Sequence, residues 1–179
     1  MPEVLIRPAV SPDIDAISKL SHTIDTTKVW QMSQTSDAGQ VSTMFNEVQL
    51  PRAMRIPYPK SPDLLLERWK DYSSVMVGCV GGVPVGYITL ITLFVTDMVW
   101  IKDLVVDEPW RRQGVGFSLI RSANDWGLLR KNIRMTLECS SKNYPAISLA
   151  KKAGFEFSGF DDNYFRNNDI ALFFSRNLK

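Results

Sequence analysis

A glycine turn preceded by two arginines is the strongest chemical signal in the sequence. Gly114 and Gly116 stand where an apolar run gives way to a helix-like pattern, and Arg111 and Arg112 come just before them. The first amides of a helix lack backbone partners and carry partial positive charge, and glycine lets an anion approach them closely. The arginines add two full charges. The turn is therefore predicted to bind a phosphate or pyrophosphate group.

Two common nucleotide motifs are absent from the chain. The sequence has neither Gly-x-x-x-x-Gly-Lys-Ser/Thr, which is typical of nucleoside triphosphate binding, nor Gly-x-Gly-x-x-Gly, which is typical of dinucleotide binding. An unrelated nucleotide-phosphate binder that reuses a glycine turn is left as an alternative.

The elements that must hold this turn follow from hydrophobic periodicity. Residues 97–106 are rich in β-branched and aromatic side chains and predict a strand, and residues 116–130 repeat apolar side chains at helical spacing. Further strands are expected at residues 4–7, 73–80, 83–91, 135–139, 155–160 and 170–175, and further helices at 11–20 and 143–152. This order predicts a mixed α/β domain.

The segment from residue 21 to residue 71 has a weaker pattern. It is polar, contains Gly39, and carries prolines at positions 51, 57, 59 and 62. This composition predicts two helical pieces joined by irregular chain, which would form a lid or pocket wall.

The turn and its surroundings resemble a known family. Residues 104–116 are similar to the acetyl-CoA signature of the GNAT superfamily of N-acetyltransferases, Gln/Arg-x-x-Gly-x-Gly/Ala, which Arg111, Gly114 and Gly116 fill. Residues 143–155 resemble the family's Asn-x-x-Ala-x-x-apolar-Tyr-x-Lys-x-Gly-Phe segment. A looser similarity to streptothricin-type acetyltransferases rests on residues 137–139, 153–161 and 169–174.

The resemblance implies a fold and a reaction. It implies a GNAT-like α/β fold whose mixed, mostly antiparallel, twisted sheet splays at the acetyl-CoA site and is flanked by helices. It implies direct transfer of an acetyl group from acetyl-CoA, as cosubstrate, to a primary amine, without a covalent enzyme intermediate. The cofactor-binding residues it implies are Leu104, Val105, Val106, Arg111, Arg112, Gln113, Gly114, Val115, Gly116, Phe117, Ser118 and Asn143.

One residue departs from the family pattern. The usual tyrosine acid is replaced by Ala150. Either another hydroxyl, such as Tyr144 or Tyr164, supplies the proton to the leaving thiolate, or solvent does. A catalytically weak or silent acyl-CoA-binding sensor is the alternative function.

Glu138 and Asp103 are the candidates for the general base. Both are carboxylates on predicted strands that would flank the cleft. A carboxylate on a strand is often only paired with a neighbouring cation, and for Asp103 that cation would be Lys102 or another basic group. Side chains alternate between the two faces of a strand, so the face that each carboxylate occupies stays open.

The acceptor is expected to be a cationic amine, either a small molecule or a peptidyl group. The segment 21–71 and the final hairpin carry carboxylates that would suit it, namely Asp25, Asp37, Glu47, Asp161, Asp162 and Asp169.

Composition limits the remaining possibilities. The 179 residues predict a single domain, 1–179, in which 21–71 is the acceptor-side segment and 97–155 the acetyl-CoA-binding core. A net charge of +2 does not favour nucleic acid or a membrane surface as partner.

Other features bear on location and assembly. Cys79 and Cys139 are expected to be buried thiols, no signal peptide or membrane span is evident, and a cytoplasmic location is expected. With His22 as the single histidine, no metal site is expected. A monomer or a homodimer is expected, the latter through a sticky edge at the aromatic C-terminal strand.

Overall fold

The computed structural model describes residues 3–178, in which a seven-stranded sheet forms the centre of the fold. In spatial order its strands are β1 (Leu5–Pro8), β4 (Ser74–Val80), β5 (Val83–Leu93), β6 (Met98–Val106), β7 (Arg134–Ser140), β9 (Ala171–Asn177) and β8 (Glu156–Asp161). Only β6 and β7 pair in parallel, and every other neighbouring pair is antiparallel. The expected mixed, mostly antiparallel sheet is confirmed.

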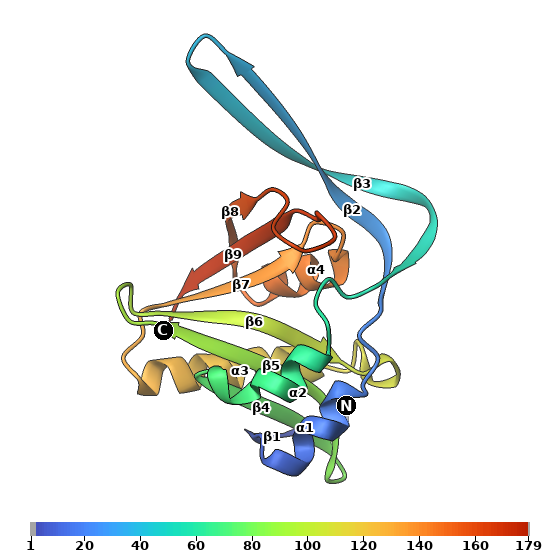
Figure 1. Ribbon diagram of the computed structural model, residues 1–179, viewed down its shortest axis with the longest axis vertical. Helices are drawn as coiled ribbons and strands as arrows, with labels where there is room; N and C mark the ends of the chain where they lie inside the picture. Colours follow the sequence, from blue (N-terminus) through green and yellow to red (C-terminus); the bar gives the residue numbers. More distant parts are fainter. Residues whose placement is uncertain (1–2, 179) are drawn as a thin grey trace.

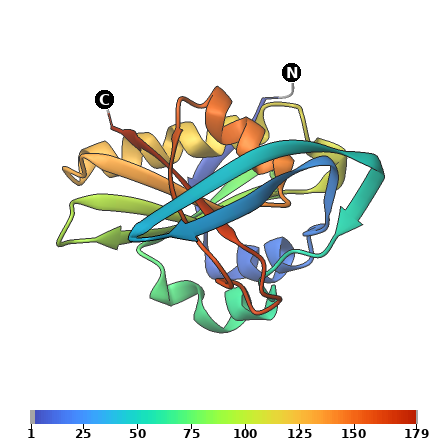
Figure 2. The ribbon, with the colours of Figure 1, turned by 90° about the horizontal axis from the view of Figure 1, so that it is seen from above.

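Helices cover both faces of the sheet (Figures 1 and 2). The back face carries α3 (Val115–Leu129) and α4 (Tyr144–Lys152), and the front face carries α1 (Ser11–Ser18) and α2 (Asp63–Arg68). Two short 3₁₀ turns, η1 (Trp69–Asp71) and η2 (Glu108–Trp110), complete the set. None of the helices within residues 3–178 is long and apolar enough to cross a membrane.

The two faces of the sheet differ in polarity at β7. On the back face, Leu119 and Ile120 of α3 and Ile147 of α4 pack on apolar side chains of the sheet and are at most 2% exposed. On the front face, β7 presents Thr136, Glu138 and Ser140, which are buried although polar. Buried polar groups need partners, so the front face holds a hydrogen-bonded network at β7, whereas under α1 and α2 it holds an apolar cluster.

A β-bulge in β6 sets the orientation of its side chains. Asp103 pairs with Thr89 of β5 and Ile101 pairs with Leu90, so Lys102 is an extra residue without a counterpart. An extra residue shifts the alternation of side chains between the faces. As a result Asp103 shares the front face with Glu138, while Ile101 points back into the apolar core.

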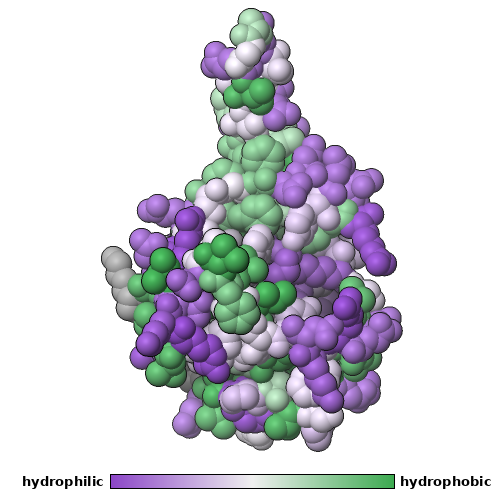
Figure 3. Space-filling model, turned by 60° about the vertical axis from the view of Figure 1, so that its left-hand side comes forward, coloured by the Kyte–Doolittle hydropathy of each residue, from purple (hydrophilic) through white to green (hydrophobic). Residues whose placement is uncertain are grey.

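The segment after α1 differs from the sequence-based expectation. The helical pieces predicted for residues 21–71 are wrong over most of that range. Residues 24–56 form a long hairpin, the arm, made of β2 (Ile24–Asp37) and β3 (Gln40–Ile56), and only α2 and η1 are helical. The arm projects from the body as a narrow two-stranded ribbon (Figures 1 and 3).

Aromatic side chains hold the base of the arm on the body. Trp30 and Phe45 of the arm meet Phe157, Phe160 and Phe174 of β8 and β9, with ring centroids 5.2 to 5.8 Å apart. Beyond this aromatic base, residues 33–42 are all exposed. The mostly polar sequence of the tip explains why periodicity did not reveal a strand that packs on nothing.

The C-terminal strand is not an edge strand. β9 lies between β7 and β8, so both of its sides are paired. The expected sticky edge at this strand is therefore wrong, and the edges of the seven-stranded sheet are β1 and β8.

Candidate active site

The predicted phosphate turn forms the start of α3. Gly114 is the N-cap residue and has a left-handed backbone with φ of +88°, which favours glycine. The amides that follow it open the helix and point out of its N-terminus, as an anion site requires. Gly116 is needed for a different contact: a Cβ atom there would lie 3.0 Å from Leu149 of α4. Its lack of a side chain lets the two helices approach.

The two arginines of the turn have different surroundings. Arg111 donates from Nε to the carbonyl of Val106 at 2.9 Å and from Nη2 to the carbonyl of Ser21 at 2.8 Å. It therefore braces the turn against the neighbouring chain. Arg112 is exposed. Gln113 donates to the carbonyl of Pro109 at 2.7 Å, which also stiffens the turn.

A cleft opens where β6 and β7 part. Their pairing runs from Met98 to Ile101 and from Arg134 to Leu137, and it stops there. Beyond that point Leu104 of β6 and Glu138 to Ser140 of β7 line the cleft, together with Asn143 and Ala146 at the start of α4. Unpaired backbone groups of two diverging strands can bind an extended ligand between them. Asn143 also caps α4, accepting from the amide of Ala146 at 3.1 Å.

Glu138 lies on the front wall of this cleft among cationic and hydroxyl groups. Its Oε1 is 2.9 Å from Nζ of Lys60, and its Oε2 is bound by Nζ of Lys102 and by the hydroxyl of Tyr164 at 3.0 Å. The side chain is 1% exposed. Such burial of a carboxylate requires these partners.

Asp103 faces the same space from β6. It accepts hydrogen bonds from four side chains: Thr89 at 2.7 Å, Tyr58 at 2.9 Å, Lys60 at 3.2 Å and Tyr72 at 3.3 Å. The structure thus answers the open question of faces, since Asp103 and Glu138 lie on the same one. The cation paired with Asp103 is Lys60, not Lys102.

The charges in this cluster are fixed near neutral pH. Burial by itself would raise the pKa of Asp103, but the charge of Lys60 and the hydrogen bonds from Thr89 and Tyr58 hold it below its ordinary value. Burial opposes the charged form of Lys60 as well, yet the two carboxylates raise its pKa well above the usual range. Burial and the Asp103 charge raise the pKa of Tyr72 to about 12. Asp103 is thus ionised, and Lys60 is an ammonium.

The two tyrosines considered as acids lie in different places. Tyr164 lies in the cluster, where its hydroxyl contacts Glu138 and accepts from Lys102 at 2.9 Å. Tyr144 lies at the base of the arm, with Nζ of Lys28 at 5.2 Å from its ring centroid. Ala150 is fully buried in the back core and brings no polar group to the cleft.

Three of the six acids expected around the acceptor are already paired with cations. Asp25 binds Arg55 at 2.9 Å, Glu47 binds Lys28 at 2.5 Å, and Asp169 binds Lys142. Asp37 lies at the exposed tip of the arm, and Asp161 and Asp162 are exposed where β8 ends. Of this group, Asp169 is buried beside the cleft wall, where it accepts from Ser140 at 3.2 Å.

Several residues of the site could not be predicted from the sequence. Lys60, Tyr58 and Tyr72 come from the segment between the arm and β4, and Lys102 is the bulge residue. One pattern in the sequence could have indicated them, namely the alternation of Pro57, Tyr58, Pro59 and Lys60. Prolines hold a chain extended, and in an extended chain every second side chain, here Tyr58 and Lys60, points to the same side.

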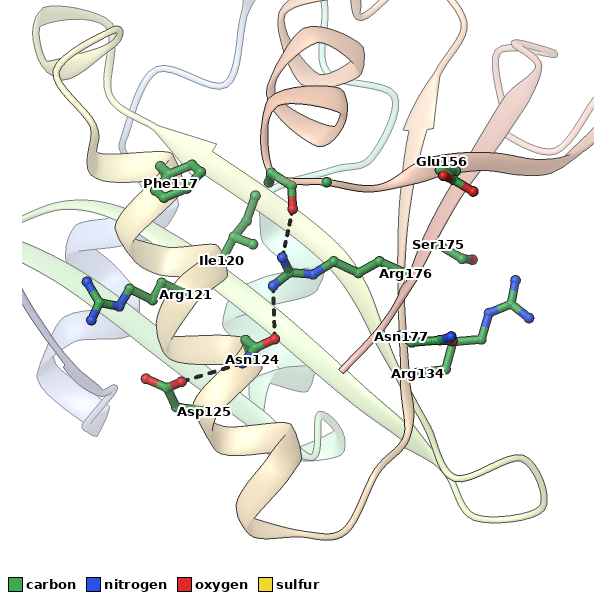
Figure 4. Close-up of a pocket in the computed structure, with 12 residues that line it drawn as sticks. Phe117, Ile120, Arg121, Asn124, Asp125, Arg134, Glu156, Ser175, Arg176 and Asn177 are labelled. Atoms are coloured by element: carbon green, nitrogen blue, oxygen red, sulfur yellow. Dashed lines mark hydrogen bonds between the residues drawn. The ribbon is translucent and has the colours of Figure 1, made fainter. Parts of the chain in front are cut away.

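A second hollow lies on the back face, between α3 and the neighbouring ends of α4 and β9 (Figure 4). It has a volume of about 830 Å³ and begins at Phe117, in the first turn of α3. Arg176 reaches across its floor and donates to the carbonyl of Ala153 at 2.7 Å and to Asn124 at 3.0 Å. Burial lowers the pKa of this arginine.

Comparison with curated proteins identifies relatives. A streptothricin acetyltransferase of Escherichia coli is 38% identical over 65 residues, a match that spans 36% of this chain and 37% of that protein. An L-amino acid N-acetyltransferase of Escherichia coli strain K12 is 27% identical over 176 residues, which cover 94% of this chain and 92% of that protein.

Solved structures share the fold along nearly the whole chain. A nourseothricin acetyltransferase superimposes with a TM-score of 0.85 at 22% identity, covering 98% of this chain and 99% of its own. A Bacillus anthracis structure solved in complex with acetyl coenzyme A gives a TM-score of 0.75 at 19% identity, covering 98% of this chain and 99% of its own.

The sequence profile of the acetyltransferase (GNAT) family matches residues 43–155, which is more than half of the chain. The fold expected from the resemblance, with its sheet splayed between β6 and β7, is confirmed. On this profile and this fold, the chain belongs to the acetyltransferase (GNAT) family.

Proposed function

We propose that the protein transfers an acetyl group from acetyl-CoA to a primary amine by direct attack. The observation that carries the proposal is the cleft between β6 and β7, which has helix N-terminal amides at one end and the buried carboxylate of Glu138 on its front wall. A CoA thioester needs the first feature, and an ammonium acceptor needs the second.

The cofactor would be held mainly by backbone. The amides of residues 113–117 would bind the pyrophosphate, with the hydroxyl of Ser118 and the charge of Arg112 beside them. The backbone of Leu104, Val105 and Val106, where β6 has left β7, would pair with the extended pantetheine arm, and Asn143 would flank it. The hollow that begins at Phe117 offers room for the adenosine end.

Glu138 would act as the general base, with Asp103 as the neighbouring carboxylate that attracts the acceptor's charge. The acceptor nitrogen gives a proton to Glu138 and forms a C–N bond to the acetyl carbon. The C–S bond breaks, the nitrogen loses its second proton to the leaving CoA thiolate, directly or through solvent, and Glu138 returns its proton to solvent. Tyr164, hydrogen-bonded to Glu138, is placed to pass a proton between Glu138 and the cleft, and solvent can serve instead. A thiol is acidic enough to leave with little help.

The proposed class of acceptor follows from the negative charge on the front wall of the cleft. Two buried carboxylates on one face suit a primary ammonium group. Two relatives bear names that refer to amine substrates of this kind, one a streptothricin and the other an L-amino acid. We infer that the acceptor is a small cationic amine or a peptidyl amine.

Release of free CoA thiol tests the proposal. Purified protein is incubated with acetyl-CoA and a panel of primary amines, and the thiol is followed with a chromogenic disulfide. Thiol release that requires an amine is the expected result. CoA binding without amine-dependent release by any member of the panel would instead identify a silent acyl-CoA sensor.

A further inference from the structure

The ammonium of Lys60 occupies a cation site. Its Nζ lies near three oxygens: Oδ1 of Asp103 at 3.2 Å, Oε1 of Glu138 at 2.9 Å, and the carbonyl of Lys102. That carbonyl belongs to the bulge residue of β6, at the point where β6 leaves β7. An ammonium has three donors and no acceptor; here Nζ of Lys60 donates to Asp103 and to the carbonyl of Lys102, and its contact with Oε1 of Glu138 is an ion pair without a hydrogen bond.

Every carboxylate oxygen of this site already has a cation or a hydroxyl beside it, but Oε1 of Glu138 is buried and accepts no hydrogen bond from residues 3–178, and its neighbour is the ammonium of Lys60 at 2.9 Å. Lys102 and Tyr164 bind the second oxygen of Glu138. Thr89 and Tyr72 bind the second oxygen of Asp103, and Tyr58 shares the first with Lys60. An acceptor ammonium can reach either carboxylate only by taking the place of a group that is already there.

Of the groups bound to Asp103 and Glu138, Lys60 is the one best able to move out of the site. Thr89 and Lys102 are fixed on paired strands of the sheet, whereas Lys60 lies between β3 and α2, outside both elements. The side chain of Lys60 is 22% exposed and that of Lys102 is 21% exposed, so both border solvent, and the two lysines differ in the backbone that carries them. Residues 57–62 also contain three prolines, which remove backbone donors that could tie this segment to its surroundings.

We propose that Lys60 holds the place of the acceptor's ammonium, and that a substrate amine binds by displacing it. This inference rests on the proposed function and narrows its substrate class to amines that arrive as primary ammonium ions. A neutral or anionic acceptor cannot compete for two carboxylates against an internal cation. Lys60 is thus a specificity-determining residue, and its occupancy of the site lowers the apparent affinity for every acceptor.

Displacement of Lys60 would also free Glu138 to act as the general base. When Lys60 leaves, Oε1 of Glu138 loses its cation, while Lys102 and Tyr164 keep the other oxygen in place. The incoming ammonium then lies against the freed oxygen, which takes its proton before the nitrogen attacks the thioester. The carboxylate would therefore be available as a base only when an acceptor is present.

Removal of the internal cation tests the displacement. Lys60→Met keeps the length of the side chain without its charge, and Lys70→Met, at an exposed lysine of η1, is the matched control. With n-butylamine as acceptor, Lys60→Met should lower KM by about tenfold or more, because the competitor is gone. CoA affinity should be unchanged, and the control should behave as wild type. An unchanged or raised KM in folded Lys60→Met would show that Lys60 is a fixed counter-ion and overturn the proposal.

A rescue experiment tests the cation site without acetyl-CoA. In Lys60→Ala the vacated space should bind n-butylammonium, which should raise the thermal unfolding temperature of this variant but not that of wild type, and n-butanol should have no effect. An equal response of both proteins, or none, would contradict an ammonium site. Because no transfer is measured, this result stands apart from the proposed function, which fails instead if wild type releases no thiol with any amine.

Discussion

The two walls of the β6–β7 cleft are built in different ways. The proposed cofactor wall consists of the Gly114 turn, the start of α3 and the part of β6 that does not pair with β7, and the groups proposed to bind CoA there are amides and carbonyls. The acceptor wall consists of side chains from distant parts of the chain, with Asp103 and Glu138 on strands and Lys60 from the segment after the arm. The first wall depends on local backbone geometry, and the second on long-range placement.

Because of this difference, we expect one wall to bind the cosubstrate and the other wall to select the acceptor. A backbone site is common to every member of a fold that preserves the turn, so it specifies the cosubstrate. A side-chain site can change with each inserted segment, so it specifies the acceptor. Substitutions on one wall should therefore leave the other wall's ligand largely unaffected.

The largest effect is expected on the cofactor wall, from Gly114→Asp. An aspartate there would place a negative charge against the pyrophosphate, and CoA affinity should fall by at least about 100-fold. Gly82→Asp is the matched control, since Gly82 also has a left-handed backbone, with φ of +82°, and open space around it. Both variants carry the same strain of about 1 to 2 kcal/mol. Calorimetric titration with CoA should find loss of binding in the first alone, and equal affinities would refute the anion site.

A smaller effect is expected where the arm meets the body. Phe45→Ala removes a ring from the aromatic base and should lower the free energy of unfolding by about 2 kcal/mol. Met44→Ala, at the adjacent residue, which is 61% exposed, should cost less than about 0.5 kcal/mol. Urea unfolding measures both. CoA affinity should be kept in each, and a loss of CoA binding in Phe45→Ala would mean that the two walls are not independent.

The smallest effect concerns pH and His22 on the front face. Its Nδ1 lies 2.7 Å from the carbonyl of Leu20 and so carries the proton, which leaves Nε2 to accept from the hydroxyl of Tyr87 at 2.9 Å. Burial lowers the pKa of His22 below its ordinary value of 6.5, although Leu20 and Asp103 partly oppose this. Below pH 6.5 the unfolded chain therefore binds a proton that the folded chain does not.

The free energy of unfolding should accordingly decrease as the pH falls from 6.5 until it reaches the folded-state pKa of His22. His22→Gln should show a flatter dependence over the same interval, because His22 is the single histidine of the sequence. Chemical unfolding at several pH values measures the two slopes. Identical slopes would show that the imidazole is solvated like a free histidine.

The cofactor wall could be predicted from the sequence because its signals are local. Gly114 indicates a left-handed N-cap. The apolar spacing from Leu119 to Ala123 predicts the helix that follows, and the apolar run before Gly114 predicts the strand. Each of these features lies within a few residues of the next, so propensity and periodicity are sufficient.

The acceptor wall could be predicted only in part. Glu138 and Asp103 were recognisable as strand carboxylates, but the bulge at Lys102 decides which face Asp103 occupies, and periodicity does not reveal a bulge. The arm was mistaken for helices because its tip packs on nothing and its sequence has no apolar stripe to show a strand. Lys60 reaches the site only after the arm has brought the chain back to the sheet.

The most direct test of this division is Glu138→Gln, assayed for both walls in one preparation. The glutamine keeps the shape of the side chain but cannot take a proton, so kcat for acetyl transfer should fall by about 100-fold or more. The affinity for CoA, measured by calorimetry on the same sample, should equal that of wild type. Undiminished transfer, or loss of CoA binding in the folded variant, would contradict the account.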